Sequence, residues 1–206
     1  MLKGLDDIEW SRLTHAYGAA TDVPVLITSL ISPDEDQRCA ALQELFTNIW
    51  HQGTIYDASV QALPFLIELL NAPGDLVPDR ESVALLVASI IAGTGYCQVH
   101  YATERINPFT RQPLPRPSDL TERLAQELVV VREVRQRGTP AIPFLLPYLR
   151  NDDAYVRSTV AKALGCYPGS SSVIKPALLK ALTAEQDHEV RVAIEAALHA
   201  LAPDPV

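Results

Sequence analysis

Three histidines and one cysteine have the residue types and spacing that come nearest to a metal site. Cys97 and His100 are spaced like a ligand pair, and His15 and His51 would have to complete the site from distant segments. A structural zinc ion usually has four protein ligands in well-defined spacing. Because two of the four ligands would come from separate segments, we expect neither a metal nor a cofactor.

Sequence motifs of catalysis are absent or incomplete. The chain has no Gly-x-Ser-x-Gly elbow, no Gly-x-x-x-x-Gly-Lys-Ser/Thr, no Gly-x-Gly-x-x-Gly and no His-Glu-x-x-His. The adjacent pairs Asp6 with Asp7 and Asp152 with Asp153 diverge in direction, so they suit helix capping better than acid–base catalysis. We therefore predict that the chain is not an enzyme and has no catalytic residues.

Aromatic and polar residues gather in three short stretches whose composition suits recognition. Tyrosine and tryptophan give a large contact area at a low entropic cost and are enriched at interaction hot spots. The predicted binding edge consists of His15, Tyr17, Trp50, His51, Gln52, Thr54, Tyr56, Tyr96, His100 and Tyr101. The alternative is that these residues hold loops against the body of the protein by satisfying backbone groups.

A recurring proline, apolar stretch and arginine indicate which elements position this edge. In each of four copies the arginine follows the proline by about 15 residues: Pro24 and Arg38, Pro64 and Arg80, Pro143 and Arg157, Pro176 and Arg191. After each arginine, apolar residues recur at helical spacing, most clearly from Val190 to Leu201. The acidic turns between them suit the capping of a following helix. A fixed period of helical pairs predicts a solenoid, with each proline early in the first helix of its pair.

We predict an all-α fold, an α-solenoid of about five helical pairs in a single domain over 1–206. A short N-terminal cap helix is expected over 5–13. The repeats are expected over 21–50, 57–92, 94–137, 139–165 and 171–201. The third repeat is predicted to be degenerate.

The degenerate repeat is inferred from a double-length gap between Pro64 and Pro143. Its helix is expected over 119–137, with the apolar residues Leu120, Leu124, Leu128 and Val131 on one face. Residues 93–118 contain several prolines and are predicted to be an insertion or an ordered loop that replaces a helix. Within it, Arg111–Pro117 would be extended, either as a loop spacer or as a docking peptide.

The repeated pattern resembles the HEAT repeat, most closely in Ile142–Leu164 and Ile174–Leu198. It runs from a proline and spaced leucines through a short acidic turn to Val-Arg and Ala-x-x-Ala-Leu. The resemblance implies a ladder along the stack in which turn aspartates pair with the repeat arginines. Those aspartates are Asp36, Asp79, Asp153 and Asp187.

The first ninety residues also look like a bacterial group of HEAT-repeat proteins, related to the repeats of bilin lyases. The resemblance is carried by His15–Pro24 and His51–Tyr56. No established reaction comes with that group, so the resemblance implies a fold and a bacterial source more than an activity.

Composition limits the partners that we expect. The 206 residues are 48% hydrophobic and carry a formal charge of −8, which disfavours a phosphate-tracking surface and favours a basic protein partner over nucleic acid. The three cysteines are odd in number and far apart, which is typical of free thiols in a reducing compartment. Without an apolar leader or a span of roughly 20 apolar residues, we expect no membrane partner and a cytoplasmic location.

These observations favour a non-enzymatic protein-binding scaffold or adaptor that uses the inter-repeat edge and the concave face. An immunity-type inhibitor of a basic bacterial toxin is one form of that function. The alternatives are a bilin-lyase-like HEAT protein and, further from the composition, a HEAT-like DNA glycosylase, which would need a basic groove. The sequence leaves the oligomeric state open.

Overall fold

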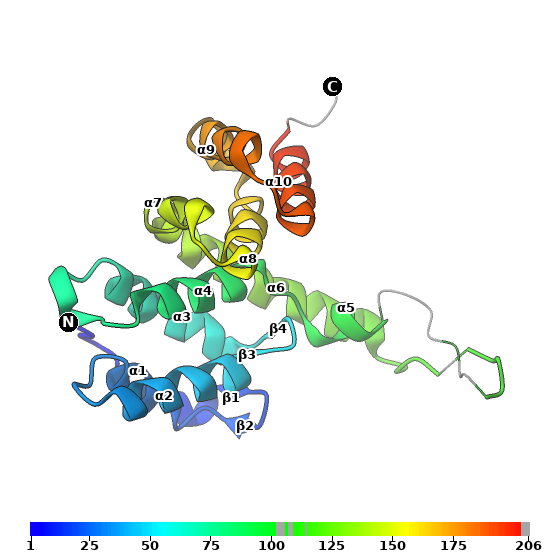
Figure 1. Cartoon of the computed structure of the whole chain (residues 1–206). Coiled ribbons are helices and arrows are strands. Elements are labelled where there is room, and N and C mark those ends of the chain that lie inside the picture. Colours follow the sequence, from blue (N-terminus) through cyan, green and yellow to red (C-terminus); the bar gives the residue numbers. More distant parts are fainter. Residues whose placement is uncertain (102–105, 107–108, 114, 203–206) are drawn as a thin grey trace.

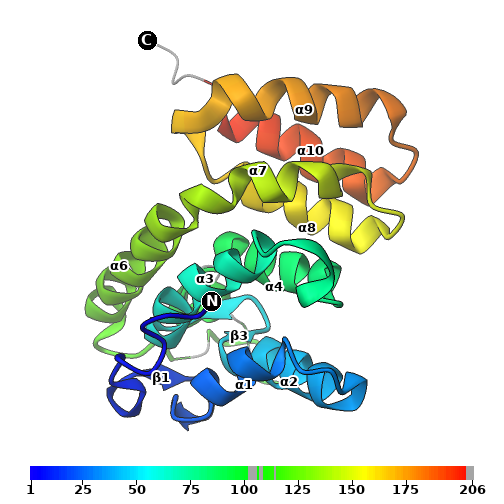
Figure 2. The ribbon, with the colours of Figure 1, turned by 90° about the vertical axis from the view of Figure 1, so that its left-hand side faces the viewer.

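The protein is a stack of helical pairs, as Figures 1 and 2 show for the computed structural model. The structure describes residues 1–101, 106, 109–113 and 115–202. The predicted α-solenoid is confirmed. Within the described stretches no helix is both long enough and apolar enough to cross a membrane.

The helices follow the chain in five consecutive pairs over the described residues. They are α1 (Val23–Ser29) and α2 (Glu35–Asn48), α3 (Asp57–Leu70) and α4 (Arg80–Ala92), α5 (Tyr96–Tyr101) and α6 (Leu120–Gly138), α7 (Ile142–Leu145) and α8 (Ala154–Leu164), and α9 (Ser171–Ala184) and α10 (His188–Ala200). Short 3-10 helices lie at Trp10–Arg12, Gly74–Leu76, Thr139–Ala141, Leu146–Arg150 and Pro168–Ser170. The third pair is degenerate, because α5 has only 6 residues against 19 in α6, whereas the 4-residue α7 is continued by 3-10 helices on both sides.

Acidic turns begin the second helix of three pairs by direct capping. The Asp34 carboxylate accepts from the Gln37 amide at 3.2 Å, and the Asp153 carboxylate accepts from the Tyr155 amide at 2.8 Å. The Asp187 carboxylate accepts two amides at the start of α10. Each carboxylate thereby satisfies an amide that has no partner within its helix.

All four repeat arginines fasten the turn inside their own pair by donating to backbone carbonyls. Their acceptors are Ser32 and Pro33 for Arg38, Leu69, Leu70 and Gly74 for Arg80, Asn151 and Asp152 for Arg157, and Leu182 and Glu185 for Arg191. A guanidinium presents several donors in a fixed fork, so one arginine can close a whole turn.

The expected aspartate ladder is only partly correct. Arg38 reaches Asp79 of the next pair at 2.6 Å, as the resemblance implied. Arg157 instead pairs with Glu185, through contacts of 2.7 and 2.9 Å. Asp187 does not pair with Arg157 because its carboxylate caps α10. Glu185, two residues earlier in the chain, pairs with Arg157 in its place.

The prolines do not all begin their helices. Pro24 and Pro143 lie in the first turn, where a missing amide is tolerated, but Pro64 and Pro176 lie inside α3 and α9. The expectation for these two was wrong: α3 and α9 begin at Asp57 and Ser171, where the repeats were expected to begin, so more than one helical turn precedes each proline. A proline inside a helix removes one backbone hydrogen bond and bends the helix.

The expected cap helix over 5–13 is absent, and only Trp10–Arg12 forms a 3-10 turn. The indole of Trp10 donates to the Leu5 carbonyl at 2.8 Å, so the segment folds back on itself as a loop. Leu5 and Trp10 are both buried and cover the first pair. The hydrogen bond of the Trp10 indole, and not a helix, therefore holds this segment over the first helical pair.

Helix α4 lies inside the core and packs against α3, α6 and α8. Leu86, Ile90 and Ile91 of α4 are fully buried. Figure 2 shows α4 in the middle of the stack, with α1 and α2 on one side and α8 to α10 on the other. This central helix therefore joins the N-terminal and C-terminal halves of the solenoid.

Helix α6 lacks a full-length partner, which changes the burial expected for its apolar face. Val131 is buried, Leu120 and Leu124 are half-buried, and Leu128 is 53% exposed. All four residues lie in α6, as predicted, but Leu128 is left exposed because α5 covers only part of α6. Residues 96–101, predicted as part of an insertion, form α5 itself.

Candidate functional site

Two small β-hairpins lie in the connections that precede α1 and α3. Their strands are β1 (Thr14–His15) with β2 (Gly18–Ala19), and β3 (Trp50–His51) with β4 (Thr54–Ile55). The helical periodicity gave no sign of these strands, which are only two residues long. They form because the chain reverses between helices and pairs its own backbone groups.

The connections bond to one another as well as within themselves. The Ala16 amide donates to the Asn48 carbonyl at 3.0 Å, and Thr94 bridges the second hairpin through the Gly53 carbonyl and the Ile55 amide. These bonds join the connections before α1, α3 and α5 into one edge. The predicted common edge is therefore present, although its role in binding remains a prediction.

His15 has its partners inside the fold. Its Nε2 lies 2.9 Å from the Asp22 carboxylate, and its Nδ1 accepts from the Tyr17 amide at 3.0 Å. Asn48 donates to the other oxygen of Asp22 at 2.6 Å, so the carboxylate ties two connections together. With both ring nitrogens engaged and the side chain buried, His15 holds the first hairpin in place.

Aromatic side chains form the rim of the edge around the two hairpins. Tyr17 is 67% exposed and meets His51 edge to face, with ring centroids 5.6 Å apart. Trp50 is half-buried and packs edge-on against Phe46 at 6.2 Å, as part of the core boundary. Gln52 has a φ of +51° at the hairpin turn, where its side chain is exposed.

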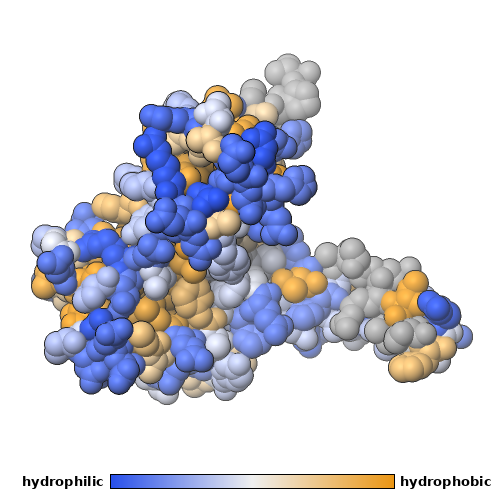
Figure 3. Space-filling view, in the orientation of Figure 1, coloured by the Kyte–Doolittle hydropathy of each residue, from blue (hydrophilic) through white to orange (hydrophobic). Residues whose placement is uncertain are grey.

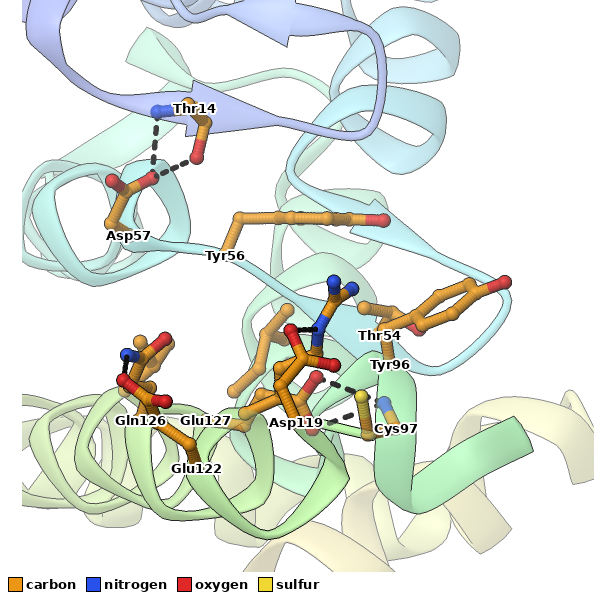
Figure 4. Close-up of a pocket in the computed structure, with 13 residues that line it drawn as sticks. Thr14, Thr54, Tyr56, Asp57, Tyr96, Cys97, Asp119, Glu122, Gln126 and Glu127 are labelled. Carbon is orange, nitrogen blue, oxygen red and sulfur yellow. Dashed lines mark hydrogen bonds and ion pairs between the residues drawn. The ribbon is translucent and has the colours of Figure 1, made fainter. Parts of the chain in front are cut away.

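A pocket of about 610 Å3 lies between this edge and helix α6. It is lined by Thr14, Thr54, Ile55, Tyr56, Asp57, Tyr96, Cys97, Asp119, Glu122, Arg123, Gln126, Glu127 and Val130. Figure 4 shows the Tyr56 ring reaching across from the edge, with the carboxylates of α6 opposite it and Tyr96 at the α5 side. The degenerate repeat creates this space because α5 covers only part of α6.

The lining is acidic. Four carboxylates face one guanidinium, a formal charge of −3. Asp119 is paired with Arg123 at 2.8 Å, which lowers the pKa of that carboxyl through the hydrogen bond. Glu122 has the neutral Gln126 amide as its donor at 3.4 Å, so its charge is not neutralised by that contact. The pocket therefore favours a positively charged group.

Tyrosines from successive connections supply the aromatic part of the pocket. Tyr56 is half-buried, and burial raises its pKa, with smaller contributions from Tyr17 and Tyr96 nearby. Tyr96 is 49% exposed and stacks at a tilt on His100, with ring centroids 4.1 Å apart. Tyr101 ends α5 and is half-buried. The neutral phenol rings present apolar faces and hydroxyl groups beside the carboxylates.

Glu127 fixes α5 against α6. Both of its carboxylate oxygens accept the Cys97 amide, at 2.9 and 3.0 Å. A Cβ at Gly95 would lie only 2.1 Å from a Glu127 oxygen, so this close approach requires glycine. Burial raises the pKa of the Cys97 thiol, which keeps it neutral. A neutral, buried thiol suits packing better than nucleophilic chemistry.

Of the ten residues predicted as a binding edge, only Thr54, Tyr56 and Tyr96 line the pocket. His15, Thr54 and Trp50 are built largely into the fold, while Tyr17 and His51 form a neighbouring rim. Sequence reasoning missed the acidic wall. Its members are Asp57, Asp119, Glu122 and Glu127. From the sequence, the carboxylates of α6 looked like the solvent-exposed face of an amphipathic helix. Nothing in the pattern shows which segment of the chain lies opposite them.

The zinc arrangement considered for Cys97, His100, His15 and His51 is not formed. His15 is bonded on both nitrogens, and His100 stacks on Tyr96. Over the described residues, no three His, Cys, Asp or Glu side chains are placed to hold a metal ion.

The fold and the linked connections define a helical-repeat protein. Residues 122–199, from α6 to α10, match the family model of HEAT repeats. The match includes both segments in which the sequence resembled that repeat, and it confirms the resemblance there.

Similar solved structures include an engineered protein and a designed armadillo repeat protein. One engineered protein has 20% identity over 87% of this chain and 81% of its own, with a TM-score of 0.40. A designed armadillo repeat protein in complex with the peptide (KR)4 has 16% identity over 87% of this chain and 81% of its own, with a TM-score of 0.37. At such values no functional argument rests on them. No curated protein matches the sequence.

Proposed function

We propose that this protein is a non-enzymatic protein-binding scaffold that holds a basic segment of its partner in the acidic, tyrosine-lined pocket beside α6. The observation that carries the proposal is the joining of Tyr56 and Tyr96 with uncompensated carboxylates in one open pocket. A cationic side chain in this pocket would contact both carboxylates and aromatic rings. Carboxylates accept its hydrogen bonds, and aromatic faces attract its charge.

The same pocket disfavours the alternatives. A DNA glycosylase needs a basic surface for phosphates, whereas the lining here carries a formal charge of −3 and the whole chain −8. The thiol in the pocket, Cys97, is kept neutral by burial, which does not suit covalent catalysis. No feature of the pocket favours bilin attachment.

We further propose that residues 1–206 form one domain in a bacterial cytoplasm. All three cysteines are unpaired in the structure, which suits a reducing compartment. Inhibition of a basic toxin would be one form of the proposed binding, because opposite charge speeds the encounter of two proteins.

Affinity capture with pocket variants tests the proposal. Glu122→Lys reverses a charge in the pocket, and Tyr96→Ala removes an aromatic wall that is half-exposed and therefore dispensable for folding. We expect both variants to lose the proteins that the wild type retains from a lysate of the source organism. Circular dichroism should show that both variants keep the helical fold.

The matched control is Glu44→Lys, which makes the same charge change at an exposed position on α2, outside the pocket. It should retain the same proteins as the wild type. Equal retention by Glu122→Lys, Tyr96→Ala and the wild type would show that the pocket is not the binding site.

A further inference from the structure

An arm projects from the body between α5 and α6. Figure 1 shows its described part, in green, extending well away from the helical stack. An antiparallel bridge between Ile106 and Pro113 closes the arm into a hairpin, and Arg111 has a φ of +58° at its turn. Phe109 is 93% exposed, and the space-filling view shows hydrophobic surface at the end of the arm (Figure 3).

The arm has the opposite charge to the rest of the protein. Between positions 106 and 118 the sequence contains Arg111 and Arg116 but no aspartate or glutamate, in a chain whose formal charge is −8. Both arginines are exposed. The prolines at 113, 115 and 117 restrict this stretch to extended backbone, which loses little entropy when it binds.

The pocket beside α6 has the complementary composition. Extended proline-rich segments dock in grooves lined by aromatic side chains, and the pocket presents Tyr56 and Tyr96. Its carboxylates, which include the uncompensated Glu122, match the guanidinium groups of the arm. One chain therefore carries both halves of a recognition pair.

We propose that the arm of one copy of this protein occupies the pocket of a second copy, and that the exchange is reciprocal. The arm leaves the body at the end of α5 and returns at the start of α6, and both of these helices line the pocket. Arm and pocket therefore lie at the same end of the molecule, and a two-fold axis there places each arm beside the other copy's pocket. In the structure the arm points away from the helical stack (Figure 1).

This inference goes beyond the proposed function, because it concerns self-association. An external basic segment would compete with the arm for the same pocket. The two ideas have separate readouts, since the capture experiment reports other proteins and sedimentation reports the mass of this one.

Sedimentation velocity over a range of concentrations tests the exchange with complementary variants of the full chain. We expect the wild type and the Glu44→Lys control to form dimers. The arm variant Arg111→Glu/Arg116→Glu and the pocket variant Glu122→Lys should each dimerise at least about tenfold more weakly, because like charges then meet. An equimolar mixture of wild type with the arm variant should retain one intact arm and pocket contact and give an intermediate dimer affinity.

A labelled peptide of residues 106–118 supplies an independent measurement. Its fluorescence anisotropy should rise on addition of the arm variant, whose pocket is intact, and should not rise with Glu122→Lys. A wild type that stays monomeric at every concentration would overturn the proposal, including the case in which the peptide binds and the arm folds back on its own pocket. A dimer that is unaffected by both variants would overturn it equally, since the contact would lie elsewhere.

Discussion

At the scale of single residues, burial separates two histidines that looked alike in the sequence. His15 is 9% exposed and joins Asp22 to the Tyr17 backbone. His51 lies on the surface rim beside the exposed Tyr17 ring, and its Nδ1 lies 3.1 Å from the Thr47 carbonyl in an exposed contact. The first histidine therefore stabilises the fold, whereas the second is available for contact with a partner.

This distinction predicts different effects of alanine at the two histidines. His15→Ala should lower the free energy of unfolding by about 1 to 3 kcal/mol, because Asp22 and the Tyr17 amide lose a buried partner. His51→Ala should change it by less than about 0.5 kcal/mol. Urea denaturation followed by circular dichroism measures both. Equal losses would contradict the assignment of His15 as the structural residue.

The Arg157 and Glu185 pair is the most buried ion pair between the last two repeats. Glu185 is 8% exposed and accepts two bonds from Arg157, and this hydrogen bonding lowers its pKa from 4.5 to about 2. A carboxyl whose pKa falls on folding adds stability above its ordinary pKa. That contribution is lost as the pH falls from about 4.5 toward 2.

We therefore expect Glu185→Gln to remove part of the acid sensitivity of the protein. At pH 7 the variant should be less stable than the wild type by about 3 kcal/mol, since Arg157 keeps its charge without a carboxylate. The difference should shrink at pH 3. Glu9→Gln, in the exposed pair with Arg12, is the control and should change little at either pH. Urea midpoints measured at the two pH values give the stability difference between Glu185→Gln and the wild type. A difference that grows on acidification would contradict the assigned direction of the pKa shift of Glu185.

At the scale of elements, α6 connects the degenerate repeat to the regular ones. Its N-terminal half faces the pocket and the solvent, and its C-terminal half is packed in the stack. Gly138 ends the helix at a close approach, where a Cβ would lie 2.4 Å from the Tyr167 hydroxyl and 2.9 Å from Ile91. The glycine is required by packing between α4, α6 and the residues after α8.

Substitution of this glycine tests the packing. Gly138→Ala should destabilise the protein by about 1 to 3 kcal/mol, because the added methyl group forces Tyr167 or Ile91 to move. Gly169→Ala is the matched control, since nothing lies within 4 Å of its Cβ position. Thermal unfolding of the two variants gives the comparison. A Gly138→Ala variant as stable as the wild type would mean that the helix ends are less tightly joined than the distances indicate.

At the scale of the whole molecule, the stack has a gradient of burial from its centre to its ends. Helix α3 buries most of its residues, whereas the terminal helix α9 buries only Ile174, Leu178 and Ala181. In a solenoid each repeat contacts only its neighbours, so the local stability follows the number of buried faces.

Hydrogen exchange in the intact protein should reveal this gradient. The amides of α4 are expected to exchange most slowly, because α4 is covered by α3, α6 and α8. The amides of α9 should exchange earlier, through partial opening of the C-terminal pair. Mass spectrometry of the exchanged protein resolves the two helices, and equal protection of both would indicate a single cooperative unit.

The repeat architecture was predictable because its signals lie close together in the sequence. Helical spacing after each arginine, capping carboxylates such as Asp153 and the recurring prolines all act within one pair of helices. The exposure of Leu128 was not predictable, because it depends on the length of the neighbouring helix α5. The arginine partner Glu185 was likewise missed, since a shift of two residues in a turn leaves the pattern unchanged.

The sequence by itself determined the periodic framework and located the unusual segments of this protein in its connections and its double-length gap. Only the tertiary structure decided which of those residues meet. It buried His15 within the edge, and it placed Tyr56 opposite Glu122, which lies 66 positions away in the chain. Periodicity reports the forces acting along one helix, whereas a pocket depends on the distance between segments that share no pattern.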